Sequence, residues 1–161
     1  MKNKMTEKLF ELAYTDSMTE VQNRNAYEER LKKLRKPNAN ISRITVIVVD
    51  VNGLKEINDS YGHFCGDDAI KTVAKALRDT IGLKADIFRI GGDEFVCISE
   101  SNVLLYISQF KDTIYFINNE KLYNLSVSIG YSRFHEKYSK VIDDIICRAD
   151  EKMYMDKKSK K

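Results

Sequence analysis

Ten residues, 88–97, place the strongest constraint on the fold of this chain, because two short apolar runs flank the glycine pair Gly91 and Gly92. This pattern predicts a tight β-hairpin, since glycine tolerates the positive φ that a tight turn requires. Asp93 and Glu94 follow the glycines at the start of the second expected strand. Carboxylates placed there are costly unless they face water, a cation or a binding partner. A plain polar hairpin tip and a functional site are both compatible with these ten residues alone.

A second strand is predicted directly before another carboxylate. Residues 44–50 are apolar and β-branched almost throughout, and they end in Asp50. A short continuous apolar run is typical of a central strand that is covered on both faces. If this strand lies beside the hairpin, Asp50 and Asp93 converge at one edge of the sheet and repel each other unless a cation lies between them. Because these ligands are oxygens, the predicted cation is Mg²⁺, with Mn²⁺ as the alternative ion.

The apolar spacing elsewhere predicts helices around these strands. They cover residues 2–15, the stretch that follows residue 24 and ends before Pro37, the stretch that begins at Asp67 and Asp68 and ends at Gly82, residues 103–117, and the stretch from 142 onward. Alternation in residues 125–134 predicts a further, half-buried strand. This order of elements predicts a single α/β sandwich around a mixed sheet. Helix 2–15 is either a connector to an upstream domain or a plain packing helix.

The composition excludes several classes of protein. The chain has 161 residues, 43% of them apolar and 32% charged, as in an ordinary soluble domain. A net charge of +3 does not indicate nucleic-acid binding, and the longest apolar run, 44–49, is far too short to span a membrane. Three scattered cysteines argue against a disulfide framework or a zinc site and for a reducing compartment. We therefore expect a cytoplasmic protein, or a cytoplasmic part of a longer one, without direct contact with membrane or nucleic acid.

Several motifs in residues 16–161 resemble those of the GGDEF family, the diguanylate cyclases. Gly-Gly-Asp-Glu-Phe at 91–95 is the string from which the family takes its name. The stretch after residue 49 resembles the family's strand-end block at Asp50, Lys55, Asn58, Asp59, Gly62, His63, Gly66 and Asp67. Residues 16–24, the Ser-Ile-Gly at 128–130 and the closing stretch 149–157 resemble three further family blocks. The matches at fixed spacing after residue 49 are the most specific part of the resemblance.

The resemblance implies a fold and a reaction. The fold is an α+β sandwich with a mainly antiparallel sheet wrapped by helices, akin to nucleotidyl cyclases and polymerase palms. Residues 16–161 would form the GGDEF domain, and residues 1–15 a connector helix from an upstream sensory domain. The reaction is the Mg²⁺-dependent condensation of two GTP into cyclic di-GMP with release of two pyrophosphates. Because the product is two-fold symmetric and each site holds one GTP, a weak or transient homodimer of half-sites is expected.

The resemblance also assigns roles to single residues. The metal ligands are the side chains of Asp50 and Asp93 and the backbone carbonyl of Val51, and the residues needed for catalysis are Asp93 and Glu94. The groups that hold the triphosphate are the backbone of Gly53, Leu54 and Lys55 and the cations Lys157 and Lys161. Guanine offers two N–H donors on one edge, which Asn58 and Asp67 would read; without the motif, Asp67 is better explained as a helix cap. Arg89 either approaches the phosphates or packs on the hairpin.

Three residues depart from the family's usual ones, namely Glu20, Asn52 and Gly53. We expect the turn at Glu20 to differ as a result. The departures support an alternative function, a catalytically inactive GGDEF domain that binds GTP or a partner protein as a regulatory module. Many family members also carry an Arg-x-x-Asp motif for product inhibition, and residues 82–85 lack both of its charged residues. No product-inhibition site is therefore expected on this face.

Overall fold

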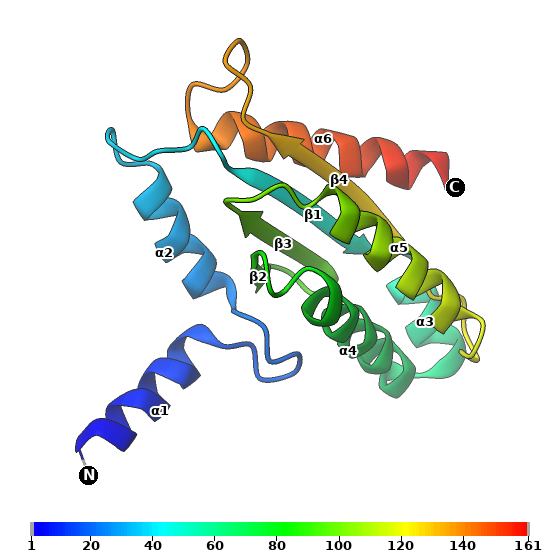
Figure 1. The fold of residues 1–161 in the computed structure, drawn as a ribbon. Helices are drawn as coiled ribbons and strands as arrows, with labels where there is room; N and C mark the ends of the chain where they lie inside the picture. Colours follow the sequence, from blue (N-terminus) through cyan, green and yellow to red (C-terminus); the bar gives the residue numbers. More distant parts are fainter. Residues whose placement is uncertain (1, 161) are drawn as a thin grey trace.

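An antiparallel four-stranded sheet with the order β2-β3-β1-β4 lies at the centre of the computed structural model, which describes residues 2–160 and the side chains from residue 8 on (Figure 1). The strands are β1 (Thr45–Val51), β2 (Asp86–Arg89), β3 (Glu94–Ser99) and β4 (Val127–Arg133). The helices are α1 (Lys2–Tyr14), α2 (Arg24–Leu34), α3 (Leu54–Tyr61), α4 (His63–Thr80), α5 (Leu104–Asn118) and α6 (Ile142–Ser159). The predicted α+β sandwich is confirmed, and so is the hairpin formed by β2 and β3. The reason given for the hairpin turn is wrong, because neither Gly91 nor Gly92 adopts a positive φ.

The sheet is antiparallel between its named strands, whereas a mixed sheet was expected. Every pair of neighbouring named strands in residues 2–160 is antiparallel. A parallel contact is limited to an isolated bridge between Gln22 and Phe88. The amide of Gln22 donates to the carbonyl of Ile87 (3.0 Å), and the amide of Arg89 donates to the carbonyl of Gln22 (2.8 Å). This segment therefore covers the outer edge of β2, an edge that would otherwise be free to pair with another chain.

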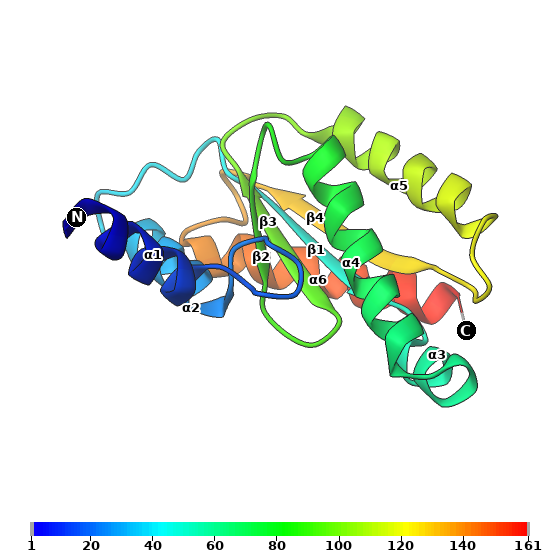
Figure 2. The ribbon, with the colours of Figure 1, turned by 90° about the horizontal axis from the view of Figure 1, so that it is seen from below.

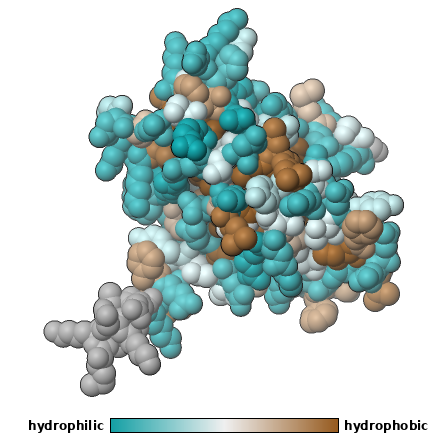
Figure 3. All heavy atoms as spheres, in the orientation of Figure 1, coloured by the Kyte–Doolittle hydropathy of each residue, from teal (hydrophilic) through white to brown (hydrophobic). Residues whose placement is uncertain are grey.

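Helices cover both faces of the sheet (Figures 1 and 2). On one face the buried residues of α4 and α5 pack against Ile47 and Val49 of β1, and on the other face α2 and α6 pack against Val46 and Val48. All seven residues of β1 are buried, as expected of a central strand. Hydrophilic residues surround smaller hydrophobic areas on the surface shown in Figure 3. Within residues 2–160, none of the helices combines the length and the apolar character that crossing a membrane requires.

The open edge of β4 is covered by side chains of α6. Bonds between the two elements include the one from the amide of Ile129 to Asp156 Oδ2 (2.8 Å) and the one from Lys152 Nζ to the carbonyl of Tyr131 (3.1 Å). Lys160, the C-cap of α6, donates its Nζ to the carbonyl of Val127 (2.8 Å). Lysines bond the outward carbonyls and a carboxylate bonds the outward amide, so the side chains supply what a neighbouring strand would supply. These contacts fix the position of α6 along the sheet.

The start of α4 differs from the prediction. The helix begins at His63, and its N-cap is Gly62 with φ of 85°, whereas the sequence pattern placed the start at Asp67 and Asp68. Both aspartates lie in the second turn of α4, so the explanation of Asp67 as a helix cap is wrong. Gly62 makes the earlier start feasible, because its positive φ lets the chain turn directly from α3 into α4.

The turn at Glu20 keeps a backbone conformation typical of glycine. Glu20 has φ of 61°, in the left-handed region that a residue with a Cβ atom rarely adopts. Arg78 Nη1 holds this turn by donating to the carbonyl of Thr19 (2.6 Å) and to Glu20 Oε2 (3.1 Å). Glu20 therefore adopts a glycine-like backbone conformation at the position where the family usually has glycine.

Candidate functional site

Three acidic residues meet where β1 and β3 lie side by side. Asp50 is directly opposite Glu94 in the antiparallel register, and the amide of Val51 donates to the carbonyl of Asp93 (2.9 Å). Directly opposite residues on antiparallel strands place their side chains on the same face of the sheet. Asp50 and Glu94 thus share the face that α6 covers. The structure therefore places the three acidic residues that the sequence assigned to catalysis and metal binding at one end of the β1–β3 pair.

Asp50 is buried and forms an ion pair with Lys157 of α6. Lys157 Nζ lies 2.7 Å from Oδ1 and 2.8 Å from Oδ2 of Asp50, whose side chain is only 6% exposed. Burial raises the pKa of the Asp50 carboxyl; the bond from Lys157 opposes this rise, and the charge of Asp93 adds to it. The bond to Asp50 raises the pKa of Lys157. The sequence assigned these two residues to a metal and to a phosphate, and it gave no signal that they pair with each other.

Glu94 is the second carboxyl of the site with a raised pKa. Burial is the main cause, and the negative charges of Asp93 and Asp50 contribute further. A raised pKa marks a group that accepts a proton more readily than an ordinary carboxylate. The electrostatic surroundings of Glu94 thus fit proton transfer as well as cation binding.

The turn after β1 places the start of α3 beside these carboxylates. Gly53 has φ of 64° and is the N-cap of α3, without a capping side-chain bond. Glycine is the residue that adopts this conformation without strain, so Gly53 does not weaken the turn. Leu54 packs against the core, and Lys55 is exposed. Because the first amide groups of a helix have no partner within the helix, the backbone here offers donors to an anion.

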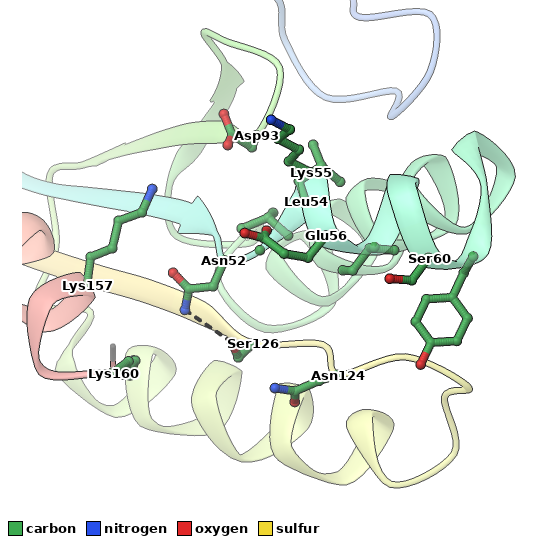
Figure 4. Close-up of a pocket in the computed structure, with 14 residues that line it drawn as sticks. Asn52, Leu54, Lys55, Glu56, Ser60, Asp93, Asn124, Ser126, Lys157 and Lys160 are labelled. Atoms are coloured by element: carbon green, nitrogen blue, oxygen red, sulfur yellow. Dashed lines mark hydrogen bonds between the residues drawn. The ribbon is translucent and has the colours of Figure 1, made fainter.

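Asn52 has a structural role in the same turn. Its Nδ2 donates to Ser126 Oγ (3.1 Å) (Figure 4). Its Oδ1 accepts from Ser128 Oγ (2.7 Å). The amide therefore ties the end of β1 to β4 without adding a charge to the site. Asn52, which departs from the family pattern, thus has a structural role here, and the neighbouring carboxylates of Asp50 and Asp93 are retained.

A cavity of about 610 Å³ opens beside the turn (Figure 4). Of the residues assigned from the sequence, it is lined by Val51, Gly53, Leu54, Lys55, Asp93 and Lys157. Sequence reasoning missed Asn124 and Ser126, which line the cavity from the loop after α5 and belong to no recognised motif. Lys160 also lines it, but its Nζ bonds Val127 and Asp156. Lys161 lies outside the described residues.

The two residues assigned to guanine lie near the junction of α3 and α4 and do not line this cavity. Asn58 of α3 rests on Gly66 of α4, where a Cβ atom would come within 1.9 Å of Asn58 Oδ1. The close approach needs glycine, and Asp67 follows Gly66 directly. Asn58 and the residue before Asp67 are thus in contact at the junction of α3 and α4, while Ile57, Ser60 and Tyr61 of α3 line the cavity.

Arg89 holds the hairpin turn. Its Nη1 donates to both carboxylate oxygens of Asp16 (3.1 and 3.3 Å), and its Nη2 donates to the carbonyl of Gly92 (2.8 Å). Burial would raise the pKa of Asp16, but the bonds from Thr19 and Arg89 outweigh it and hold that pKa below its ordinary value. Of the two roles considered for Arg89, the structure shows packing on the hairpin.

The donor set suits a hard divalent cation. Asp50, Asp93, Glu94 and the carbonyl of Val51 offer only oxygen ligands, which Mg²⁺ and Mn²⁺ prefer. Within residues 2–160, no three side chains of His, Cys, Asp or Glu are already gathered around one point in a metal-binding arrangement. Both carboxylate oxygens of Asp50 are taken by Lys157. The residues therefore fit the ion in kind, provided that Lys157 moves aside.

Comparison with known proteins points to one family. The sequence model of the family described as "Diguanylate cyclase, GGDEF domain" matches residues 13–161. Similar proteins include the probable diguanylate cyclase DgcI of Escherichia coli K12, 31% identical in an alignment of 153 residues that covers 94% of this chain and 33% of DgcI. A diguanylate cyclase of Vibrio cholerae is 29% identical in an alignment of 170 residues that covers 96% of this chain and 50% of that protein. The chain thus spans a third to a half of the length of these relatives.

Solved structures share the fold. The coiled coil and GGDEF domain of DgcB from Caulobacter crescentus, in complex with c-di-GMP, superposes with a TM-score of 0.81 at 22% identity, covering 98% of this chain and 87% of that chain. The diguanylate cyclase SiaD of Pseudomonas aeruginosa, in complex with its activator SiaC, gives a TM-score of 0.80 at 21% identity. This superposition covers 99% of this chain and 64% of the SiaD chain. At this identity the superpositions establish the architecture.

Proposed function

Because this chain belongs to the diguanylate cyclase GGDEF domain family, we propose that it condenses two GTP molecules into cyclic di-GMP with release of two pyrophosphates. The observation that carries the proposal is the meeting of Asp50, Asp93 and Glu94 beside a cavity that also contains Lys157 and the start of α3. Carboxylates for a divalent cation and donors for a polyphosphate are what nucleotidyl transfer requires. The activity of any longer protein that contains this chain is part of the same proposal.

The residues divide the work between binding and chemistry. The backbone of Gly53, Leu54 and Lys55 and the ammonium of Lys157 would bind the triphosphate. Mg²⁺, held by Asp50, Asp93 and the carbonyl of Val51, would supply charge neutralisation for the pyrophosphate leaving group. Glu94, with its raised pKa, is suited to assist proton removal from the attacking 3′-hydroxyl. Lys161, assigned to the phosphates from the sequence, stays an expectation.

Base selection is proposed for Asn58 and Asp67. A carboxylate accepts the two adjacent N–H donors of guanine as a pair, and adenine offers no such pair on that edge. The contact of Asn58 with Gly66 supports this assignment, because it keeps Asn58 and Asp67 at one junction between α3 and α4. The nucleotide would then lie across α3, with its base at this junction and its phosphates in the cavity.

A two-fold dimer would supply the second GTP. The cyclic product needs two 3′-hydroxyl attacks, and one half-site binds one nucleotide. Leu9, Phe10 and Leu12 of α1 are exposed, which supports a role of this helix in association or in connection to an upstream sensory domain. A weak dimer predicts that activity per molecule rises as the protein concentration increases from nanomolar to micromolar. Flat activity with a monomer at every concentration by light scattering would contradict the half-site model.

The alternative function is an inactive GGDEF domain that binds GTP or a partner protein. Its support came from Asn52, Gly53 and Glu20. Asn52 and Gly53 both have structural roles that leave the carboxylates in place, so they weaken the alternative.

Incubation with GTP and Mg²⁺, followed by separation of the nucleotides, tests the proposal directly. We expect cyclic di-GMP from the wild type and none from Asp93→Asn, with Asp79→Asn on the surface of α4 as the matched control that retains activity. GTP binding by calorimetry without any product would favour the inactive domain.

A further inference from the structure

The ammonium of Lys157 lies where a metal ion would have to bind Asp50. Its Nζ is nearly equidistant from the two carboxylate oxygens, at 2.7 and 2.8 Å. The Asp50 side chain is almost completely buried, whereas that of Lys157 is 33% exposed. The carboxylate is therefore fixed in the protein, and its cation is the partner that can leave.

Lys157 is one positive charge beside three negative charges. Asp50, Asp93 and Glu94 all favour the charged form of this lysine. Among the described residues, Lys157 is the only cation that bonds Asp50. One ammonium thus neutralises part of a group of three carboxylates. A divalent cation would neutralise the group better than the lysine does.

Two cations cannot share this position. Mg²⁺ binds carboxylate oxygens at about 2.0–2.1 Å and demands near-ideal geometry. The ammonium already occupies the space between both oxygens of Asp50, and the two positive charges would repel each other in a poorly solvated site. A metal at Asp50 therefore requires Lys157 to move.

The cavity has room for the Lys157 side chain once it leaves Asp50. Lys157 extends from α6 on a flexible stem of four methylene groups, and its side chain lines the same cavity as the start of α3 (Figure 4). The acidic groups that raise its pKa are Asp50, Asp93 and Glu94, and the metal would occupy the first two. Once displaced, the ammonium needs a new anion, and a phosphate group bound at the start of α3 would supply it.

We propose that Lys157 is an exchangeable counter-ion: it neutralises Asp50 in the metal-free protein, is displaced by the divalent cation, and then binds the nucleotide phosphate. This inference rests on the proposed function and deepens it. Lys157 would weaken metal binding when no nucleotide is present and strengthen nucleotide binding when metal is present. It would thereby couple the two ligands, because each binds better once the other is there.

The opposite signs of these two effects provide the test. We would titrate Mn²⁺ without nucleotide, following the signal of free Mn²⁺ by electron paramagnetic resonance, in the wild type and in Lys157→Met. The variant is expected to bind Mn²⁺ about tenfold more tightly, since typical coupling between sites is of this size. The same variant is expected to bind a non-hydrolysable GTP analogue in the presence of Mg²⁺ more weakly than the wild type.

Two further variants separate charge at Asp50 from charge in the cavity. Lys160→Met removes a lysine that lines the same cavity but bonds Val127 and Asp156, so its Mn²⁺ affinity should equal that of the wild type. Lys157→Arg retains a cation at Asp50 and should bind Mn²⁺ as weakly as the wild type. If Lys157→Met does not fold, Lys157→Gln takes its place, with the same expected gain in Mn²⁺ affinity.

The outcomes distinguish this inference from the proposed function. Equal Mn²⁺ affinity of wild type and Lys157→Met, with metal and GTP analogue still binding together, overturns the exchange and leaves the cyclase assignment intact. Absence of Mn²⁺ binding in every variant, even with the GTP analogue present, overturns the metal site itself. Tighter Mn²⁺ binding that disappears when Asp50→Asn is combined with Lys157→Met supports the exchange at Asp50.

Discussion

Gly130 of β4 lies so close to Ala149 of α6 that a Cβ atom at position 130 would come within 2.0 Å of the Ala149 backbone oxygen. The same atom would lie 2.2 Å from the backbone nitrogen of Met153. Lys157 follows one helical turn after Met153, so the depth at which α6 packs determines whether its ammonium reaches Asp50. The Ser-Ile-Gly motif is thus explained by a helix that must lie directly on the strand.

Gly130→Ala should therefore destabilise the domain. The clash is with backbone on both sides, which cannot rotate away, so we expect a loss of about 2–3 kcal/mol in the free energy of unfolding. Guanidinium chloride denaturation followed by circular dichroism measures it. Gly92→Ala is the matched control, because no atom lies within 4 Å of the Cβ position there. A loss at Gly130 no larger than that at Gly92 would show that α6 can shift at little cost.

The contact of Asp16 with Arg89 should make stability depend on pH. The pKa of Asp16 in the folded protein is below its ordinary value of 3.8, because bonds from Thr19 and Arg89 outweigh the effect of burial. A carboxylate with a lowered pKa stabilises the fold above its unfolded pKa, and this contribution is lost as the pH falls through the folded pKa. Asp16→Asn should therefore cost about 1–3 kcal/mol at neutral pH.

The difference between wild type and Asp16→Asn should shrink below about pH 4 and vanish at lower pH, where both side chains are neutral. Urea unfolding at a series of pH values measures it. Asp79→Asn removes an exposed ion pair with Lys75 and should stay within about 0.5 kcal/mol of the wild type. A gap for Asp16→Asn that is the same at pH 7 and at pH 3 would mean that the carboxylate charge is not what holds the turn.

The architecture was largely predictable from local patterns. The β-branched run before Asp50 predicted β1, and the two apolar runs around the glycine pair predicted the β2-β3 hairpin, because strand propensity is strong in both places. The positive φ expected of the glycine pair is absent, so the turn itself was not predicted correctly. The start of α4 was missed, since Asp67 and Asp68 are good capping residues and the competing signal was a single positive-φ glycine at 62. The preference of Asp67 and Asp68 for the first position of a helix was overridden there by the tight connection between α3 and α4, which starts α4 at His63.

The candidate site was predictable in its residues but not in its contacts. Motif spacing named Asp50 and Lys157 separately, yet they are more than a hundred residues apart in the chain and become neighbours only through the packing of α6 on Gly130. Asn124 and Ser126 could not be found, because they reach the cavity from a loop whose path depends on where α5 ends. Contacts of this kind depend on the tertiary structure, so a local sequence pattern does not predict them.

Base selection should depend on Asp67. If its carboxylate accepts the two guanine donors, Asp67→Ser should weaken the preference for GTP over ATP by about 1.5–3 kcal/mol for each lost bond. Competition of GTP and ATP for a fluorescent nucleotide analogue measures the preference. Asp59→Ser is the matched control, since Asp59 is an exposed carboxylate on α3 without an assigned role. An unchanged preference in Asp67→Ser would place base selection elsewhere on the chain.

The face around residues 82–85 should lack a tight site for cyclic di-GMP. A hollow of about 300 Å³ does lie there, but its arginine, Arg30, is already paired with Glu100 (2.7 Å) and Asp86 (3.4 Å). An arginine at position 82 itself would need a Cβ atom 2.5 Å from the backbone oxygen of Arg78, so the local backbone has no room for it. Lys84 is exposed, yet it lacks the planar fork that holds a phosphate with two bonds.

We therefore expect little feedback inhibition by the product through this face. Calorimetric titration with cyclic di-GMP, carried out with a saturating non-hydrolysable GTP analogue that blocks the proposed active site, should show no sub-micromolar binding. Product added to a cyclase assay should inhibit only by competing with GTP, because the cations needed to hold its phosphates here are absent or already paired. Sub-micromolar binding that persists beside the GTP analogue, and that Lys84→Ala or Arg30→Ala abolishes, would contradict this prediction and locate a product site on this face after all.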